Sequence, residues 1–121
     1  MFKKFRKQRW LMRQNMLELI PYPKVPFFIS SDQRIVLQLR RFPVKGLAHL
    51  MGKSEYVNIT LDDKGSLVWQ KIDSSRTIAQ ICTEVASYAA FDKMELLEER
   101  VAAFILSLYR QGLVDFVYEN Q

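Results

Sequence analysis

The chain is poor in the residues on which most catalytic and cofactor sites depend: its 121 residues include one cysteine, one histidine and four glycines. The single cysteine, Cys82, excludes an internal disulfide and any zinc or iron–sulfur site that needs several cysteines. The glycines are scattered, whereas a phosphate-binding loop needs them clustered. No apolar run reaches the roughly 18 residues of a membrane-spanning helix. These absences exclude several functions and identify none.

Catalytic groups are equally scarce. Acyl transfer needs a nucleophile with a base within reach, but His49 is far in sequence from Cys82 and no HExxH, CxxC or paired-carboxylate motif surrounds it. Cys82 falls on the apolar stripe of an expected helix, where a small hydrophobic residue packs well. We therefore expect a protein that is not an enzyme and that holds no metal and no cofactor.

The charge is unevenly distributed along a chain of about one domain's length. Residues 1–53 contain 12 Lys and Arg against two acidic residues, a net charge of +10. Residues 54–121 contain 6 Lys and Arg against 11 acidic residues, a net charge of −5. Such asymmetry indicates a basic segment with an anionic partner, or two parts with different roles.

Residues 1–25 are interpreted as a basic arm, and residues 26–121 as the folded domain. Arg13 and Glu18 interrupt the apolar residues of the arm, so it is not a secretion signal, and we expect a cytoplasmic protein. Apolar and basic residues alternate at near-helical spacing, which is typical of a helix lying on an anionic membrane surface or on a partner. A frayed or partner-ordered arm is the more ordinary interpretation. Three prolines in residues 21–26 then exclude regular helix.

Extended segments dominate the first part of the domain. Residues 27–29 and 35–39 flank a polar four-residue turn and predict a β-hairpin. Residues 42–53 indicate a short helix or ordered loop ending at Gly52. Residues 56–61 alternate cleanly, which predicts a third strand with Val57, Ile59 and Leu61 facing inward.

From Asp62 onward the apolar period changes from two to 3.6, which indicates helices. Asp62 or Asp63 is an expected N-cap of the first, Thr77 with Gln80 forms a capping-box pattern at the second, and Asp92 with Glu95 repeats the start signal for the third. The third helix carries the strongest apolar stripe and ends at Gly112. A short extended segment follows at residues 113–117. The fold class is therefore α+β, three strands followed by three helices.

Two binding functions remain open. Three helices and a small sheet are the elements of a winged helix-turn-helix domain. However, the expected second helix has no Lys or Arg, and the third begins with a net negative charge, which would repel the phosphates of DNA. Sequence-specific DNA binding is therefore disfavoured. Non-specific nucleic-acid binding through residues 3–13 stays open. Alternatively, if residues 56–61 form an uncovered edge strand, an extended peptide can pair with it in a groove walled by the third helix.

Residues 57–117 resemble the PqqD-like family through several ordered motifs: a strand ending in Leu-Asp, then Gly-x-x-Val-Trp, Ile-Asp, Thr-Ile and Gly-Leu-Val. They stand in this chain as Leu61-Asp62, Gly65, Val68-Trp69, Ile72-Asp73, Thr77-Ile78 and Gly112-Leu113-Val114. Upstream, residues 15–21 also look like the N-terminal stretch of longer standalone members.

The resemblance implies a winged-helix-like domain that acts as a RiPP recognition element, a peptide-binding adaptor for ribosomally made precursors. In such proteins the precursor's leader pairs with the third strand beside the third helix and is presented to a maturation enzyme, often of the radical S-adenosylmethionine type. Carried onto this sequence, the peptide-binding residues are Tyr56, Val57, Asn58, Ile59, Thr60, Arg100, Val101, Phe104, Ile105 and Leu108.

The chain departs from the family pattern in two places. Ser74-Ser75-Arg76 stands where many relatives have a glycine-containing turn, and serine tolerates a positive φ less easily than glycine. The basic segments 1–13 and 40–53 are not explained by peptide pairing. They suit an acidic maturation enzyme or an acidic leader, since complementary charge accelerates encounter.

Overall fold

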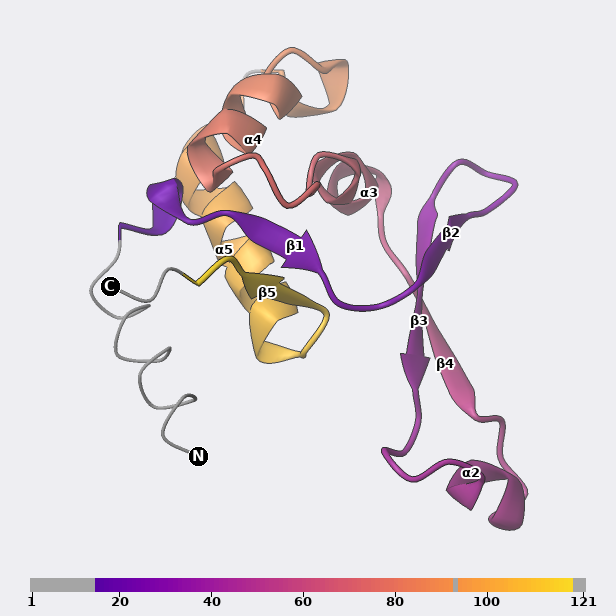
Figure 1. Cartoon of the computed structure of the whole chain (residues 1–121). Coiled ribbons are helices and arrows are strands. Elements are labelled where there is room, and N and C mark those ends of the chain that lie inside the picture. Colours follow the sequence, from indigo (N-terminus) through magenta and orange to yellow (C-terminus); the bar gives the residue numbers. More distant parts are fainter. Residues whose placement is uncertain (1–14, 93, 119–121) are drawn as a thin grey trace.

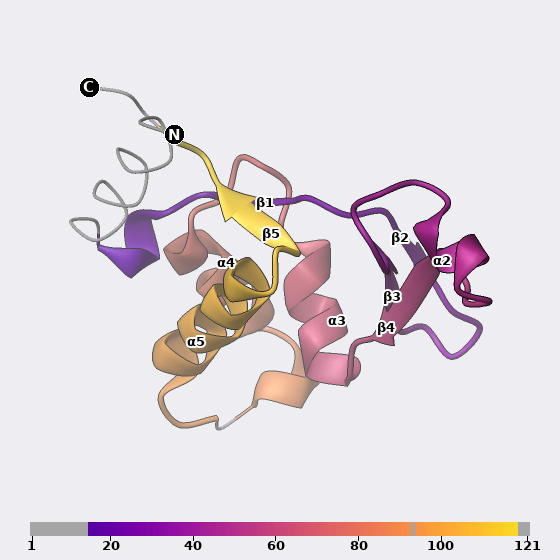
Figure 2. The same cartoon turned by 90° about the horizontal axis from the view of Figure 1, so that it is seen from below.

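The computed structural model describes residues 15–92 and 94–118, and its helices α3–α5 lie to one side of a small sheet (Figure 1). Figure 2 gives the same arrangement, with α3 between the sheet and the other two helices. The elements are η1 (Met16–Glu18), β1 (Pro21–Pro23), β2 (Phe27–Ile29), β3 (Ile35–Arg40), α2 (Leu47–Leu50), β4 (Tyr56–Thr60), α3 (Asp63–Gln70), α4 (Ile78–Val85), η2 (Ala89–Phe91), α5 (Leu97–Arg110) and β5 (Val114–Phe116).

Strands β2, β3 and β4 form an antiparallel sheet in that order, which confirms the predicted hairpin and third strand. Alternation places Ile35 and Leu37 on the inner face, where neither side chain is exposed, and the same pattern half-buries Val57 and Ile59. The α+β class with a three-stranded antiparallel sheet is therefore confirmed. The winged-helix-like arrangement stays a prediction.

The N-caps predicted for the first two helices, α3 and α4, both form. The Asp62 carboxylate accepts the backbone N–H of Gly65 at 2.7 Å at the start of α3. At α4 the Thr77 hydroxyl accepts the N–H of Gln80, and the Gln80 side chain accepts the N–H of Thr77 in return. Each pair satisfies N–H groups that a helix start leaves without partners.

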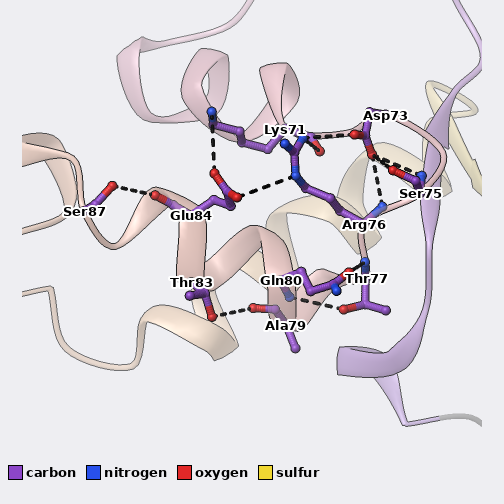
Figure 3. A network of polar contacts seen from close by, with 10 residues as sticks. All are labelled: Lys71, Asp73, Ser75, Arg76, Thr77, Ala79, Gln80, Thr83, Glu84 and Ser87. Carbon is purple, nitrogen blue, oxygen red and sulfur yellow. Dashed lines mark hydrogen bonds and ion pairs between the residues drawn. The ribbon is translucent and has the colours of Figure 1, made fainter.

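The linker between α3 and α4 is held by polar contacts, drawn in Figure 3. The Asp73 carboxylate accepts the backbone N–H groups of Ser75 and Arg76 and lies 3.0 Å from the Arg76 guanidinium. Glu84 on α4 lies near Arg76 and Lys71, at 3.8 and 3.9 Å. Ser74 adopts a φ of 69°, so a residue with a Cβ occupies a left-handed position in this turn.

The predicted start of the third helix at Asp92 is wrong. Residues Ala89–Phe91 form a separate 3₁₀ turn that ends at Asp92, and α5 begins five residues later at Leu97. Phe91 is only 5% exposed, and its carbonyl accepts the N–H of Met94 at 3.2 Å. Anchoring this aromatic side chain in the core holds the chain in a turn that a continuous helix from Asp92 would not allow.

The C-terminal end of α5 closes as the sequence indicates. Gly112 has a φ of 78°, and the N–H of Leu113 donates to the carbonyl of Leu108 in a Schellman arrangement. The chain then forms β5, which pairs antiparallel with β1. This second, two-stranded sheet was not predicted, because each of its strands has only three residues and β1 contains two prolines.

Residues 15–25, the second half of the expected arm, contact the rest of the fold. The carbonyl of Leu19 accepts the N–H of Ile78, and that of Ile20 accepts the N–H of Val117. Leu19 itself is 3% exposed and belongs to the main core. The boundary between arm and domain at residue 25 stays a prediction, as does the membrane or nucleic-acid role of residues 1–13, which lie outside the described residues.

Helix α2 lies at the far end of the β3–β4 ribbon, away from α3–α5, in both Figure 1 and Figure 2. It confirms the short helix predicted in residues 42–53, and Gly52 follows it with a φ of 71°. None of the helices within the described residues combines the length and the apolar character needed to cross a bilayer.

Candidate peptide-binding edge

Strand β4 forms one edge of the three-stranded sheet, with β3 as its neighbour. The N–H of Leu61 donates to the carbonyl of Ile35, and the carbonyl of Glu55 accepts from Arg41. Backbone groups alternate in direction along a strand, so the odd-numbered residues of β4 point theirs at β3. The N–H and C=O groups of Tyr56, Asn58 and Thr60 therefore point away from the sheet.

The two ends of this edge differ. At its beginning the Ser54 hydroxyl donates to the carbonyl of Tyr56 at 3.1 Å, and Arg40 lies 5.7 Å from the centre of the Tyr56 ring. Further along, within residues 15–92 and 94–118, no described group forms a hydrogen bond with the outward N–H or C=O of Asn58 or Thr60. The open stretch is therefore the second half of β4.

An apolar pocket of about 170 Å³ opens where β4 leads into α3. It is lined by the first two turns of α3, the segment before α5 and the first half of α5: Asp62, Lys64, Gly65, Val68, Phe91, Met94, Arg100, Val101 and Phe104. Gly65 shapes its floor, because a Cβ there would lie 3.1 Å from the Phe104 ring. The lining begins at Asp62, two residues after the end of β4.

The lining of the pocket contains two cationic side chains and one carboxylate. Lys64 and Arg100 are both exposed, and no ion pair joins either of them to another described residue. The one acidic residue of the lining, Asp62, has a carboxylate oxygen engaged with the α3 N-terminus. The pocket is therefore suited to an apolar side chain with an acidic group near it.

The structure distributes the ten predicted peptide-binding residues unequally. Tyr56, Asn58 and Thr60 present backbone groups at the open edge, whereas the side chains of Val57 and Ile59 face the inner side of the sheet. On α5, Arg100, Val101 and Phe104 line the pocket, whereas Ile105 and Leu108 lie in the core at 0% and 3% exposure. The peptide-binding role of all ten stays a prediction.

The sequence analysis did not identify the part of the pocket lining that comes from α3 and from the turn before α5. Lys64 follows the cap residue Asp62 by two positions, so a cationic side chain on the first turn was visible in the sequence. Phe91 and Met94 were hidden, because the sequence predicted a helix start at Asp92. Their place in the lining depends on the turn between α4 and α5.

Reactive groups lie apart from this site. Cys82 is 3% exposed, and burial, assisted by nearby Glu98, raises the pKa of its thiol. His49 is on α2, at the far end of the β3–β4 ribbon. Among the described residues no three His, Cys, Asp or Glu side chains are grouped so as to hold a metal ion.

Comparison with known proteins gives a family match. The sequence model of the family described as Coenzyme PQQ synthesis protein D (PqqD) matches residues 46–114, which include α2, β4, α3, α4, all of α5 and the first residue of β5. Comparison with curated proteins and with solved structures found no significant match.

Proposed function

Because the chain belongs to the PqqD family, we propose that it is a non-catalytic adaptor that binds the leader of a ribosomally made precursor peptide and presents it to a maturation enzyme. The leader adds to the sheet as a strand beside β4. The observation that carries this proposal is the outward backbone of Asn58 and Thr60, which has no partner among the described residues and lies next in sequence to an apolar pocket that begins at Asp62. A radical S-adenosylmethionine enzyme is the maturation partner that we propose.

Strand addition suits this edge because the backbone provides affinity with little demand on the guest's sequence. Each new ladder hydrogen bond contributes about 0.5–1.5 kcal/mol. The adjoining pocket supplies the selectivity, since it accepts one apolar side chain. Lys64 and Arg100 favour an acidic residue next to that side chain.

The direct test begins with the open reading frames beside the gene, where a short precursor next to a three-cysteine radical enzyme would supply the peptide. A synthetic peptide of its N-terminal half is titrated into the ¹⁵N-labelled protein. We expect the largest amide shifts at Tyr56, Asn58 and Thr60, whose N–H groups gain partners. If these three amides do not move at saturating peptide, strand addition at β4 is wrong.

A matched pair of variants at one position isolates the backbone. Asn58→Ala and Asn58→Pro both remove the exposed amide side chain, but only proline removes the outward N–H. We expect Asn58→Ala to bind like the wild type and Asn58→Pro to lose up to about tenfold in affinity, the equivalent of one hydrogen bond. Equal affinity of the two variants would contradict main-chain pairing.

A second pair tests the charge at the pocket. Arg100→Glu reverses a charge in the pocket lining, and Arg110→Glu reverses an exposed charge at the other end of the same helix. Arg100→Glu is expected to weaken binding of an acidic leader more than Arg110→Glu does, and added salt should reduce the difference. Equal losses would mean that only net charge matters.

A further inference from the structure

The second edge of the sheet, formed by β2, carries three consecutive large apolar residues that are all exposed. Phe27, Phe28 and Ile29 are 46%, 43% and 56% accessible to solvent. Edge strands of monomeric proteins usually carry a charged residue, a proline or a bulge that discourages pairing. Strand β2 contains none of these between its first and last residue. An exposed apolar edge of this kind is typical of an interaction surface.

Only half of the backbone hydrogen-bonding groups of β2 point toward β3. The carbonyl of Pro26 accepts the N–H of Gln38, and the N–H of Ser30 donates to the carbonyl of Arg34. By alternation Phe28 also points its backbone groups at β3, so those of Phe27 and Ile29 point outward. In the part of the chain that the structure describes, β2 has β3 as its sole neighbour in the sheet.

We propose that this edge pairs with the same edge of a second copy of the chain, about a two-fold axis, to form a continuous six-stranded sheet. In the antiparallel register that uses every outward group, Phe27 lies opposite Ile29 of the other copy, and Ile29 opposite its Phe27. The two residues of each copy then exchange four hydrogen bonds across the axis. This surface is separate from the β4 edge and does not depend on what binds there.

The side chains and charges suit this register. The two Phe28 residues face each other across the axis as a pair that is not hydrogen-bonded, the arrangement with the closest side chains, at about 4.5 Å between Cα atoms. The same register, continued beyond the strand ends, brings Lys24 of one copy near the turn that holds Asp32 of the other, although Asp32 also lies 3.8 Å from Arg34 of its own chain. Lys24 is exposed and forms no ion pair with another described residue. A self-complementary surface is what a two-fold interface requires.

A pair of cysteine variants tests the register. Cα atoms about 4.5 Å apart are within the range that a disulfide spans, so Phe28→Cys should form an intermolecular disulfide on mild oxidation. Tyr56→Cys is the matched control, because Tyr56 has a similar exposure of 46% but lies on the other edge strand. The buried native Cys82 does not compete. We expect Phe28→Cys to cross-link at least about tenfold faster, as pre-assembly raises the local thiol concentration. Equal rates would overturn the proposal.

A charge exchange tests the association itself. Phe28→Glu and Phe28→Lys each place like charges opposite one another in the homodimer, whereas a mixture of the two variants pairs opposite charges. Sedimentation velocity from about 10 μM to about 1 mM covers the weak affinity expected of a small interface. We expect dimers for the wild type and the mixture and monomers for each variant alone. A monomeric wild type at the highest concentration, or no recovery in the mixture, would overturn the proposal. A cooperative thermal unfolding transition of dilute Phe28→Glu, close to that of the dilute wild type, would show that this variant is folded.

Discussion

The two edges of one small sheet present the same kind of unpaired backbone but different surroundings. Strand β4 has five residues, polar side chains on its outer face and a cationic, apolar pocket at its end. Strand β2 has three residues, all apolar and exposed, with no pocket among those described that touches them. Backbone groups alone would accept any strand. The neighbouring side chains therefore distinguish the two edges, for which we propose a leader peptide at β4 and a second copy of the chain at β2.

The largest effect is expected where a substitution breaks the sheet between the two edges. Val57 and Asn58 are adjacent, but only the N–H of Val57 points at β3. Val57→Pro leaves the carbonyl of half-buried Leu39 on β3 without its donor, which costs about 1–3 kcal/mol. Asn58→Pro removes an outward N–H, so its unfolding free energy should fall much less. Urea denaturation of both variants measures the difference, and similar losses would contradict the assignment of the outward groups to the even-numbered residues of β4.

Ser66→Ala should destabilise the β4 side of the sheet by a comparable amount. The Ser66 hydroxyl accepts the N–H of Ile35 at 2.9 Å and donates to the carbonyl of Leu61 at 3.3 Å, and it is buried. Alanine leaves both backbone groups unsatisfied, at about 1–3 kcal/mol. Hydrogen exchange should then increase for Leu61 and Ile35 more than for the β2–β3 amides. Uniform exchange across the sheet would contradict this local role.

Substitutions at Phe27 and Phe28 of β2 should separate the stability of the monomer from its dimerisation. Phe27 packs edge-on against buried Trp69, with ring centroids 5.7 Å apart, whereas Phe28 faces the outer side. Phe27→Ala is expected to lower the stability of the monomer by at least the 0.5–1.5 kcal/mol or so of an aromatic pair. Phe28→Ala should leave the dilute monomer nearly unchanged and weaken only the dimer. Thermal unfolding at low concentration compares the two; a greater loss for Phe28→Ala would reverse their roles.

Ser74→Gly provides a control that should affect neither edge. Ser74 holds a positive φ of 69°, a conformation that costs a residue with a Cβ about 1–2 kcal/mol. Glycine adopts it freely but loses more entropy on folding, so we expect a net gain of about 0.5–1 kcal/mol. The melting temperature should rise while leader binding and dimerisation stay constant. A lower melting temperature would mean that the serine side chain is needed in the turn.

The smallest expected effect is on the pH dependence of stability, through Asp73, the residue before Ser74. Backbone N–H donation from Ser75 and Arg76, with help from the Arg76 guanidinium, lowers the pKa of the Asp73 carboxyl. Its folded pKa lies below its unfolded one, so its stabilisation is complete above the unfolded value of about 3.9 and is lost as pH falls through the folded pKa. Asp73→Asn should therefore flatten the acid part of the stability profile without changing the difference between the edges. An unchanged acid profile would contradict this role.

Prediction from the sequence succeeded where the pattern is local. The alternation in residues 56–61, the Asp62 and Thr77 caps and the Gly112 stop all appear in the structure, because each depends on neighbours within a few residues. The start of α5 failed because a distant contact, the burial of Phe91, outweighs the local start signal at Asp92. The pairing of β1 with β5 was not predicted, because strands of three residues gain their partners from packing.

The sequence by itself determined that this chain has an α+β fold of the PqqD family with β4 and α5 as distinct elements, because hydrophobic period and capping residues are written into adjacent positions. Only the tertiary structure decided which residues are accessible. Ile105 and Phe104 are neighbours on one apolar stripe, yet the first is sealed in the core and the second lines the pocket. Likewise, the sequence shows Phe27-Phe28-Ile29 as a strand, but only the strand order leaves it at an edge. Spacing defines a face, and the packing of distant elements determines how much of that face stays uncovered.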